Sequence, residues 1–268
     1  MTETTQSDGA PAAAHDATIA DQFTRQAVQF AASEVHHNQA ALDLLVGAAG
    51  PRPEDVSLDV ACGPGSVVVA FAPRVRRAIG LDYTEAMLDQ ARQLASKSGV
   101  ANVEWHRGDV YALPFANGTF DIVSCRYAFH HLQEPARALA EMVRVCRRGG
   151  RIVLCDATAS DDPAKASALN AMERHRDPST VEFRTLGYLR GLFAEAGLPE
   201  PAAQFYGVPG ERDRLVATSF PAGDDRAALR AMIDAAVEGD AMGVGARREG
   251  GTVRFEYPAV VLVGVKGR

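Results

Sequence analysis

Residues 58–66 read LDVACGPGS, a short apolar run that carries the carboxylate Asp59 and then breaks into a glycine-rich turn. Gly63 and Gly65 have no Cβ, so the backbone of this turn can adopt positive φ angles and approach a ligand closely. A dinucleotide-binding turn has a third glycine in the pattern GxGxxG, and Val68 occupies that position here. The turn indicates a nucleotide-type cofactor, although a tight structural turn uses the same residues.

Two further segments place an aspartate at the end of a predicted strand. Residues 79–83 read IGLDY, and Asp82 follows the glycine turn at about the separation at which the second strand of a βαβ unit places a carboxylate on ribose hydroxyls. The alternative is a helix cap, a role that Thr84 also fits. Residues 107–110 read RGDV, where Asp109 can accept from an exocyclic adenine amine and the Val110 N–H can serve a ring nitrogen. The alternative there is a turn aspartate.

Strands and helices alternate along most of the chain, which predicts an α/β fold with a doubly wound, mostly parallel sheet covered on both faces. Strands are expected at 56–61, 78–82, 103–107, 120–125, 150–156, from 202 and at 256–265, and helices at 21–46 (two), from 66, and at 84–98, 135–147, 161–179, 186–196 and 211–240 (one or two). We expect one domain over 19–268 with helical lid elements at about 20–46 and 157–185. Residues 1–18 lack periodicity and are expected to form a disordered leader.

The convergence of these motifs follows from the fold. In open α/β sheets, ligands lie beyond the carboxyl ends of the strands, where the strand order reverses. Asp59, Asp82, Asp109 and Cys125 all lie at such ends. We therefore expect the three aspartates to meet around one crevice.

In this order, the motifs resemble those of the class I S-adenosylmethionine-dependent methyltransferases, and within them the small-molecule group similar to the quinone and sterol C-methylases. The resemblance runs from about Phe23 to Leu198 and implies a seven-stranded, Rossmann-like methyltransferase fold with S-adenosyl-L-methionine as cofactor. It implies that Asp59, Ala61, Gly63 and Gly65 bind the methionine part of the cofactor. It also implies that Asp82 binds the ribose, and that Met87, Asp109 and Val110 bind the adenine. Tyr83 and Cys125, at the ends of strands two and four, join this cofactor set. Many relatives have a small or acidic residue where Cys62 stands, which should contribute mainly its backbone.

Methyl transfer from a sulfonium is an in-line displacement, which needs alignment and exclusion of water. A base is needed only if the acceptor loses a proton. His130 and His131 follow strand four and are the candidates, because neutral imidazole is a suitable base near neutral pH. The alternative is structural, with one ring packed on the sheet. Arg126, Tyr127, His36 and Arg174 are the candidates for binding the acceptor, and for the last two the alternative is a solvated helix surface.

Composition narrows the class of partner. The formal net charge of −6 and pI of 5.7 argue against a broad nucleic-acid contact. The sequence has neither a long apolar stretch nor a basic region followed by an apolar core at its start, so we expect no membrane span and a cytoplasmic protein. Its four cysteines form no CxxC pair, which predicts free thiols and no metal site. A small-molecule substrate, as in secondary metabolism, is expected, and a homodimer is one option for the assembly.

Two other functions remain open at this level. A nicotinamide-dependent oxidoreductase shares the acid after strand two, but Val68 and the Gly108–Asp109 pair argue against it. A non-methylating protein of the same fold, which binds the cofactor as a module or catalyses cyclisation or rearrangement, would keep the same motifs. The acceptor atom, whether carbon, oxygen or nitrogen, is not determined by these residues.

Overall fold

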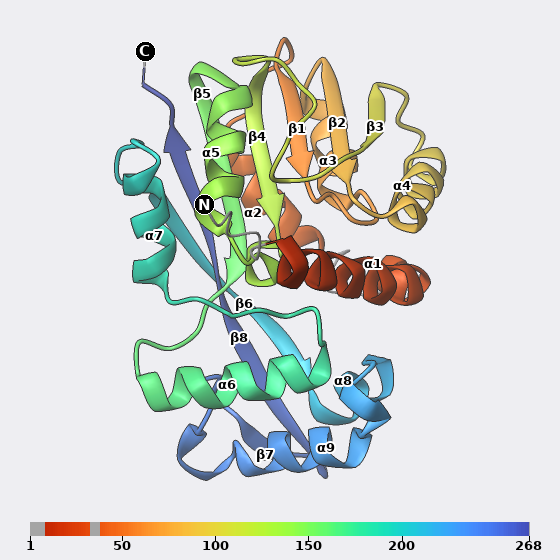
Figure 1. Cartoon of the computed structure of the whole chain (residues 1–268), viewed down its shortest axis with the longest axis vertical. Coiled ribbons are helices and arrows are strands. Elements are labelled where there is room, and N and C mark those ends of the chain that lie inside the picture. The colour runs from red at the N-terminus through yellow and green to blue at the C-terminus, as the bar shows by residue number, and fades with distance from the viewer. Residues whose placement is uncertain (1–8, 33–37, 268) are drawn as a thin grey trace, which may run out of the picture.

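The protein is built on one mixed β-sheet with the strand order β3-β2-β1-β4-β5-β8-β6 (Figure 1). A computed structural model describes residues 9–32 and 38–267. The strands are β1 (Val56–Val60), β2 (Arg77–Asp82), β3 (Val103–Arg107), β4 (Phe120–Arg126), β5 (Cys146–Ala157), β6 (Ala202–Glu211), β7 (Arg247–Glu249) and β8 (Thr252–Val265). β1 to β5 pair in parallel, whereas β8 runs antiparallel to β5, β6 and β7. The predicted doubly wound, mostly parallel α/β fold is confirmed.

Helices cover both faces of the sheet (Figure 1). They are α1 (Gly9–Ala32), α2 (Gln39–Ala49), α3 (Ser66–Phe71), α4 (Glu85–Lys97), α5 (Pro135–Val145), α6 (Pro163–Arg176), α7 (Leu186–Glu195), α8 (Arg212–Thr218) and α9 (Arg226–Ala235). Successive side chains of β4 show how one strand serves two layers. Ile122 packs in the cluster with α2, α3 and α4, and Val123 packs in the cluster with α5 and α7. Because neighbouring strand residues point to opposite faces, an apolar run buries both.

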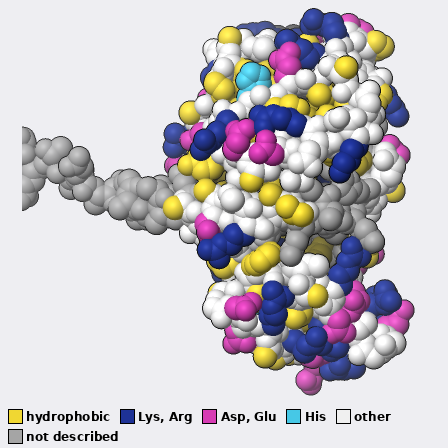
Figure 2. Space-filling view, turned by 90° about the vertical axis from the view of Figure 1, so that its right-hand side faces the viewer, with side chains coloured by type: hydrophobic (Ala, Val, Ile, Leu, Met, Phe, Trp, Pro, Cys, Tyr) yellow, Lys and Arg dark blue, Asp and Glu magenta, His cyan; other side chains and the backbone are white. Residues whose placement is uncertain are grey.

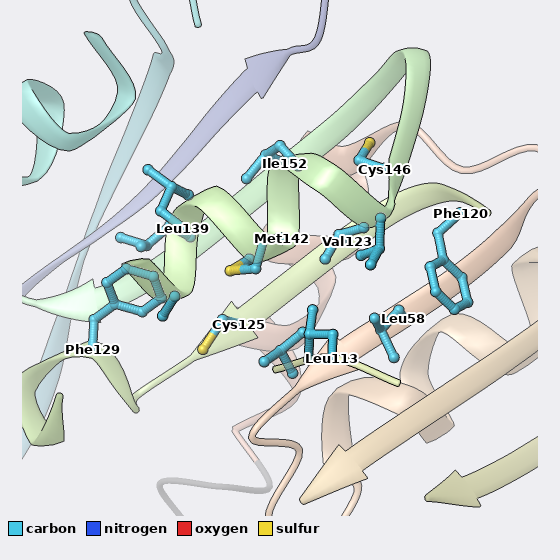
Figure 3. Packing of buried hydrophobic residues seen from close by; sticks show 14 of the residues in the cluster. Leu58, Leu113, Phe120, Val123, Cys125, Phe129, Leu139, Met142, Cys146 and Ile152 are labelled. Atoms are coloured by element: carbon cyan, nitrogen blue, oxygen red, sulfur yellow. The ribbon is translucent and has the colours of Figure 1, made fainter. Parts of the chain in front are cut away.

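The core under α5 fixes the position of the central strands (Figure 3). Leu139 and Met142 of α5 are fully buried, and they lie over β4, where Val123 and Cys125 point toward them. Burying a large aliphatic side chain contributes about 1.5–3 kcal/mol. This packing holds the carboxyl end of β4 next to that of β1.

A third, smaller cluster of buried residues supports the lower part of the molecule in Figure 1. There β6 and β8 extend past the parallel strands and carry α6, α8 and α9. Leu169 of α6, Ile233 of α9 and Val253 of β8 belong to this buried cluster. α6 begins after Asp162, whose side chain accepts from the backbone of Ala164 and so caps the helix.

Two elements differ from the sequence-based expectation. α1 begins at Gly9, so the structure is helical over residues 9–18 of the expected leader, where alanine, the best helix former, is frequent. Residues 1–8 lie outside the described part. β7 was not predicted, since its residues RRE are exposed and have no apolar alternation. It forms because Gly250 and Gly251, both at positive φ, allow a tight hairpin turn into β8.

Charges of both signs are interspersed over the described residues of the face shown in Figure 2. Near the C-terminal helices, Arg212 pairs with Asp213 at 3.1 Å and with Asp234 at 2.6 Å, and Arg248 of β7 also reaches Asp234 at 3.2 Å. These contacts join α8, α9 and β7. Within the described ranges, no helix combines the length and apolar character that crossing a membrane requires.

Candidate cofactor and substrate site

The main cavity, of about 130 Å³, lies at the carboxyl ends of β1, β2 and β4. The strand order reverses between β1 and β4, which is where an open α/β sheet forms a ligand crevice. The wall contains these residues that the sequence singled out: Ala61, Gly63, Asp82, Tyr83, Met87, Asp109, Val110, Arg126, Tyr127 and His131. The structure therefore brings motifs from four strand ends to one hollow.

Asp82 is a buried polar group of the cavity wall, and both of its carboxylate oxygens accept hydrogen bonds. One carboxylate oxygen accepts from the Gly63 N–H at 2.8 Å, and the other accepts from the Thr84 N–H at 2.9 Å. Burial raises the pKa of Asp82 to about 6, although these hydrogen bonds oppose the shift. The Tyr83 backbone and the Thr84 side chain also form hydrogen bonds with this carboxylate. The carboxylate thus links the β1 turn to β2 at the wall of the cavity.

The two glycines of the turn have different tasks. Gly63 has φ of 51°, and a Cβ there would meet no atom within 4 Å, so its backbone faces open space in the cavity wall. Gly65 has φ of 84°, and a Cβ would lie 2.6 Å from Trp105 Cη2 and 2.8 Å from Ala91 Cβ. Gly65 does not line the main cavity. It is needed because α4 and β3 pack directly against the turn.

Asp59 lies behind this wall and does not line the main cavity. It is buried, accepts from Ser124 Oγ at 2.6 Å, and borders a smaller hollow whose lining includes Cys62, Pro64 and Arg126. Those three residues also line the main cavity, so the two hollows share a wall. Burial raises the pKa of Asp59 to about 7, against the effects of Ser124 and Arg126. Of the three aspartates expected around one crevice, Asp82 and Asp109 share the main cavity and Asp59 lies beside it.

Most of the remaining predicted cofactor residues line the main cavity, whereas Cys125 does not. Met87 is buried in the cavity wall, while Tyr83 and Asp109 are exposed at its rim. Asp109 accepts from the Tyr111 N–H at 2.8 Å, which fixes the turn after β3. Cys125 is packed in the core beneath α5 and does not line the cavity (Figure 3).

The ends of β1 and β4 carry left-handed backbone at residues other than glycine. Ala61 and Tyr127 both have φ of 54° and both line the cavity. Such conformations cost about 1–3 kcal/mol and persist where the surroundings determine them. The Tyr127 N–H donates to Cys155 O at 2.8 Å, its hydroxyl lies 2.6 Å from the Tyr206 hydroxyl, and the Arg126 guanidinium lies 4.4 Å from its ring centre. Arg126 and Tyr127 are thereby held at the cavity.

The adjacent histidines point to different surroundings. His130 does not line the cavity, because its Nδ1 lies 2.7 Å from Asp156 Oδ1 and its ring stacks on Phe183 with centroids 4.4 Å apart. His131 lines the cavity, and its ring meets the edge of Phe23 from α1 at 5.0 Å. His130 is thus held away from the cavity by Asp156 and Phe183, whereas His131 belongs to the cavity wall.

One predicted acceptor-binding residue, Arg174, is not brought to the cavity. Arg174 is exposed on α6, where its guanidinium donates to Val181 O at 3.1 Å and anchors the loop after the helix. His36 lies outside the described residues. Sequence reasoning did not assign Ile19 of α1 to the cavity wall, although its spacing of four from Phe23 on one helix face was a usable signal.

Comparison with known proteins agrees with this geometry. A family model described as a methyltransferase domain matches residues 58–154. YcgJ of Bacillus subtilis, described as an uncharacterised methyltransferase, is 30% identical over 246 residues, which are 91% of this chain and 97% of YcgJ. The chain belongs to the class I S-adenosylmethionine-dependent methyltransferases.

The similarity extends to solved structures and to the C-methylases. The crystal structure of YcgJ matches with a TM-score of 0.79 and 29% identity over 86% of this methyltransferase and 99% of YcgJ. A candidate methyltransferase from Bacillus halodurans matches with a TM-score of 0.79 and 27% identity, over 85% of this chain and 100% of that one. UbiE of Roseobacter denitrificans, a ubiquinone/menaquinone biosynthesis C-methyltransferase, is 35% identical over 133 residues, 48% of this chain and 52% of UbiE.

Proposed function

We propose that this methyltransferase binds S-adenosylmethionine in the main cavity and transfers its methyl group to a small-molecule acceptor. The observation that carries the proposal is the arrangement at Asp82. A buried carboxylate at the cavity wall stands beside the bare backbone of Gly63, with Asp109 at the rim. A ribose presents two neighbouring hydroxyls to such an acceptor, and an adenine amine would reach Asp109 while Met87 packs against the base.

The methionine part would lie along Ala61 and Gly63, toward the wall that separates the main cavity from Asp59. A residue with a side chain at position 63 would project into this space, which supports a close approach of the ligand to the turn. The cofactor supplies a methyl group activated by its positive sulfonium. The protein's task is to align the acceptor with that group.

Helix α1 covers part of the cavity, which supports the proposal that the methyl acceptor is a small molecule. α1 crosses the carboxyl ends of the parallel strands (Figure 1), and its Ile19 and Phe23 line the cavity. Cover from α1 on one side reduces the access of water and restricts the approach of the acceptor. Arg126 and Tyr127 are the polar groups at the β4 end that would contact it, and His131 would accept a proton where the acceptor atom loses one.

Calorimetric titration tests the cofactor assignment. We expect S-adenosylmethionine to bind the purified protein and NADH not to bind. Binding of NADH without binding of S-adenosylmethionine would instead identify an oxidoreductase.

Incubation with a radiolabelled methyl donor and a fractionated metabolite extract tests transfer. We expect label in a low-molecular-mass product. Cofactor binding together with turnover of an unlabelled substrate would replace transfer by a cyclisation or rearrangement, and label on macromolecules alone would refute the small acceptor.

A further inference from the structure

His131 is connected to a buried hydroxyl and a buried carboxylate that come from the segment after α6. Its Nδ1 lies 3.1 Å from Ser179 Oγ, and Ser179 Oγ lies 2.6 Å from Asp177 Oδ1. The Ser179 N–H also donates to Asp177 Oδ1 at 3.0 Å. Ser179 and Asp177 are 0% and 1% exposed, so water does not compete with this chain of hydrogen bonds.

The direction of each hydrogen bond follows from the chemistry of the groups. Burial by itself would raise the pKa of Asp177, but a protonated His131, the neighbouring Arg176 and the hydrogen bonds from Ser179 act in the opposite direction and lower it. Arg176 and the Ser179 hydrogen bonds act on the carboxylate when His131 is neutral as well, and they keep Asp177 ionised. An ionised carboxylate only accepts, so the single hydroxyl proton of Ser179 is donated to Asp177. The Ser179 oxygen can then only accept from His131, which requires the proton to be on Nδ1.

We propose that Ser179 and Asp177 are positioning residues that hold His131 as the neutral Nδ1–H imidazole and leave Nε2 as its free acceptor at the cavity. Nε2 has no hydrogen-bond partner among the described residues, and the ring belongs to the cavity wall. The inference deepens the proposed methyl transfer and rests on it for its purpose. It does not rest on the cofactor for its geometry.

The groups around the ring favour the neutral form. Burial and the neighbouring His130, whose ring centre is 4.1 Å away, lower the pKa of His131, while Asp177, the backbone of Ser179 and Asp156 act in the opposite direction. From α1, His15 Nε2 lies 2.9 Å from the backbone oxygen of His131. The imidazole is therefore uncharged near neutral pH, as a base must be before it accepts a proton.

The arrangement has a defined use when the acceptor must lose a proton. The acceptor's electron pair forms the new bond to the methyl carbon, the carbon–sulfur bond breaks with its electrons going to sulfur, and the acceptor's proton passes to His131 Nε2. The resulting imidazolium donates from Nδ1 to Ser179 Oγ. Ser179 Oγ in turn donates to Asp177, whose negative charge stabilises the imidazolium. Release of that proton to solvent restores the base.

Nitrogen NMR of the ¹⁵N-histidine-labelled protein, recorded without cofactor near neutral pH, tests the proposal. A His131→Gln variant identifies the signals of this ring among those of the seven histidines. We expect Nδ1 at the protonated position and Nε2 at the unprotonated position. In Ser179→Ala the proton should shift largely to Nε2, whereas Ser179→Thr keeps the hydroxyl and should restore the wild-type pattern.

Thr180→Ala is the matched control, because Thr180 is the adjacent buried hydroxyl and its Oγ1 has no partner among the described groups. It should leave the His131 signals in place. A wild-type protein with the proton on Nε2, or a Ser179→Ala spectrum equal to wild type, would overturn the proposal. Should Ser179→Ala not fold, the wild-type and Ser179→Thr spectra still decide the tautomer. Loss of S-adenosylmethionine binding in calorimetry would count against the proposed function and leave this measurement unaffected.

Discussion

Replacing Asp82 with asparagine keeps the shape of the side chain and removes its charge. The variant therefore allows the contribution of Asp82 to folding to be measured separately from its contribution to cofactor binding. Both carboxylate oxygens accept from backbone N–H groups, at Gly63 and Thr84. An asparagine has only one acceptor oxygen, so its NH₂ group must face one of those N–H donors. A buried donor left without a partner costs about 1–3 kcal/mol, which we expect to lower the free energy of unfolding by that amount.

The effect on binding is separate from the effect on folding. A hydrogen bond to a charged acceptor contributes about 1.5–3 kcal/mol, so the loss of one ribose contact raises the Kd for S-adenosylmethionine roughly 10- to 100-fold. Isothermal calorimetry on protein shown to be folded by circular dichroism measures this Kd. Denaturant unfolding measures the stability of the same samples.

Asp89→Asn provides the matched control, since Asp89 lies exposed on α4 and pairs with Arg92 at 2.7 Å. We expect its Kd to equal that of the wild type. An Asp82→Asn protein that is folded and binds S-adenosylmethionine as tightly as the wild type would refute the assignment of the ribose to Asp82.

Three further predictions follow from burial and backbone geometry. Burial raises the pKa of Asp82 to about 6, and only the ionised carboxylate can accept hydrogen bonds at both oxygens. Calorimetry should therefore show that the affinity for S-adenosylmethionine falls by up to about tenfold per pH unit below pH 6. An equally steep fall in the Asp82→Asn variant would contradict this cause. Leu139→Ala, at a fully buried position, should lower the free energy of unfolding by about 2–5 kcal/mol in urea, and a loss below 1 kcal/mol would show that α5 is not packed as described. Gly63→Ala should lower the free energy of unfolding by about 1–2 kcal/mol, because alanine is strained in this left-handed backbone. Gly65→Ala should lower it further, because its Cβ would also meet Trp105. An equal decrease in the two variants would refute that contact.

Much of the fold was predictable because its signals are local. The strand ending at Asp82 and the helix that follows it are read from an apolar run, a polar break and a helical stripe, and the structure has them within a residue or two. β7 escaped prediction because its three polar residues are held only by the hairpin with β8. The helix at residues 9–18 escaped prediction because this segment has no apolar periodicity, and only the high helix propensity of its alanines favours a helix there.

The candidate site was predictable where a residue's position on a strand decides its exposure. Asp82 and Asp109 end neighbouring parallel strands, so they had to reach the same edge of the sheet. Asp59 also ends a strand, but whether its side chain enters the main cavity depends on how Cys62, Pro64 and Arg126 pack between the two hollows. Strand position alone does not contain that information.

The sequence by itself determined the parallel sheet, the glycine turn at its centre and the family, because apolar periodicity and motif order are properties of neighbouring residues. Only the tertiary structure decided which histidine faces the cavity. His130 and His131 are adjacent and chemically identical, and they differ because Asp156 and Phe183 hold one ring while Ser179 approaches the other from 48 residues away. Contacts between such distant segments exist only after the chain has packed, and they set the burial, the charge and the free nitrogen of each ring.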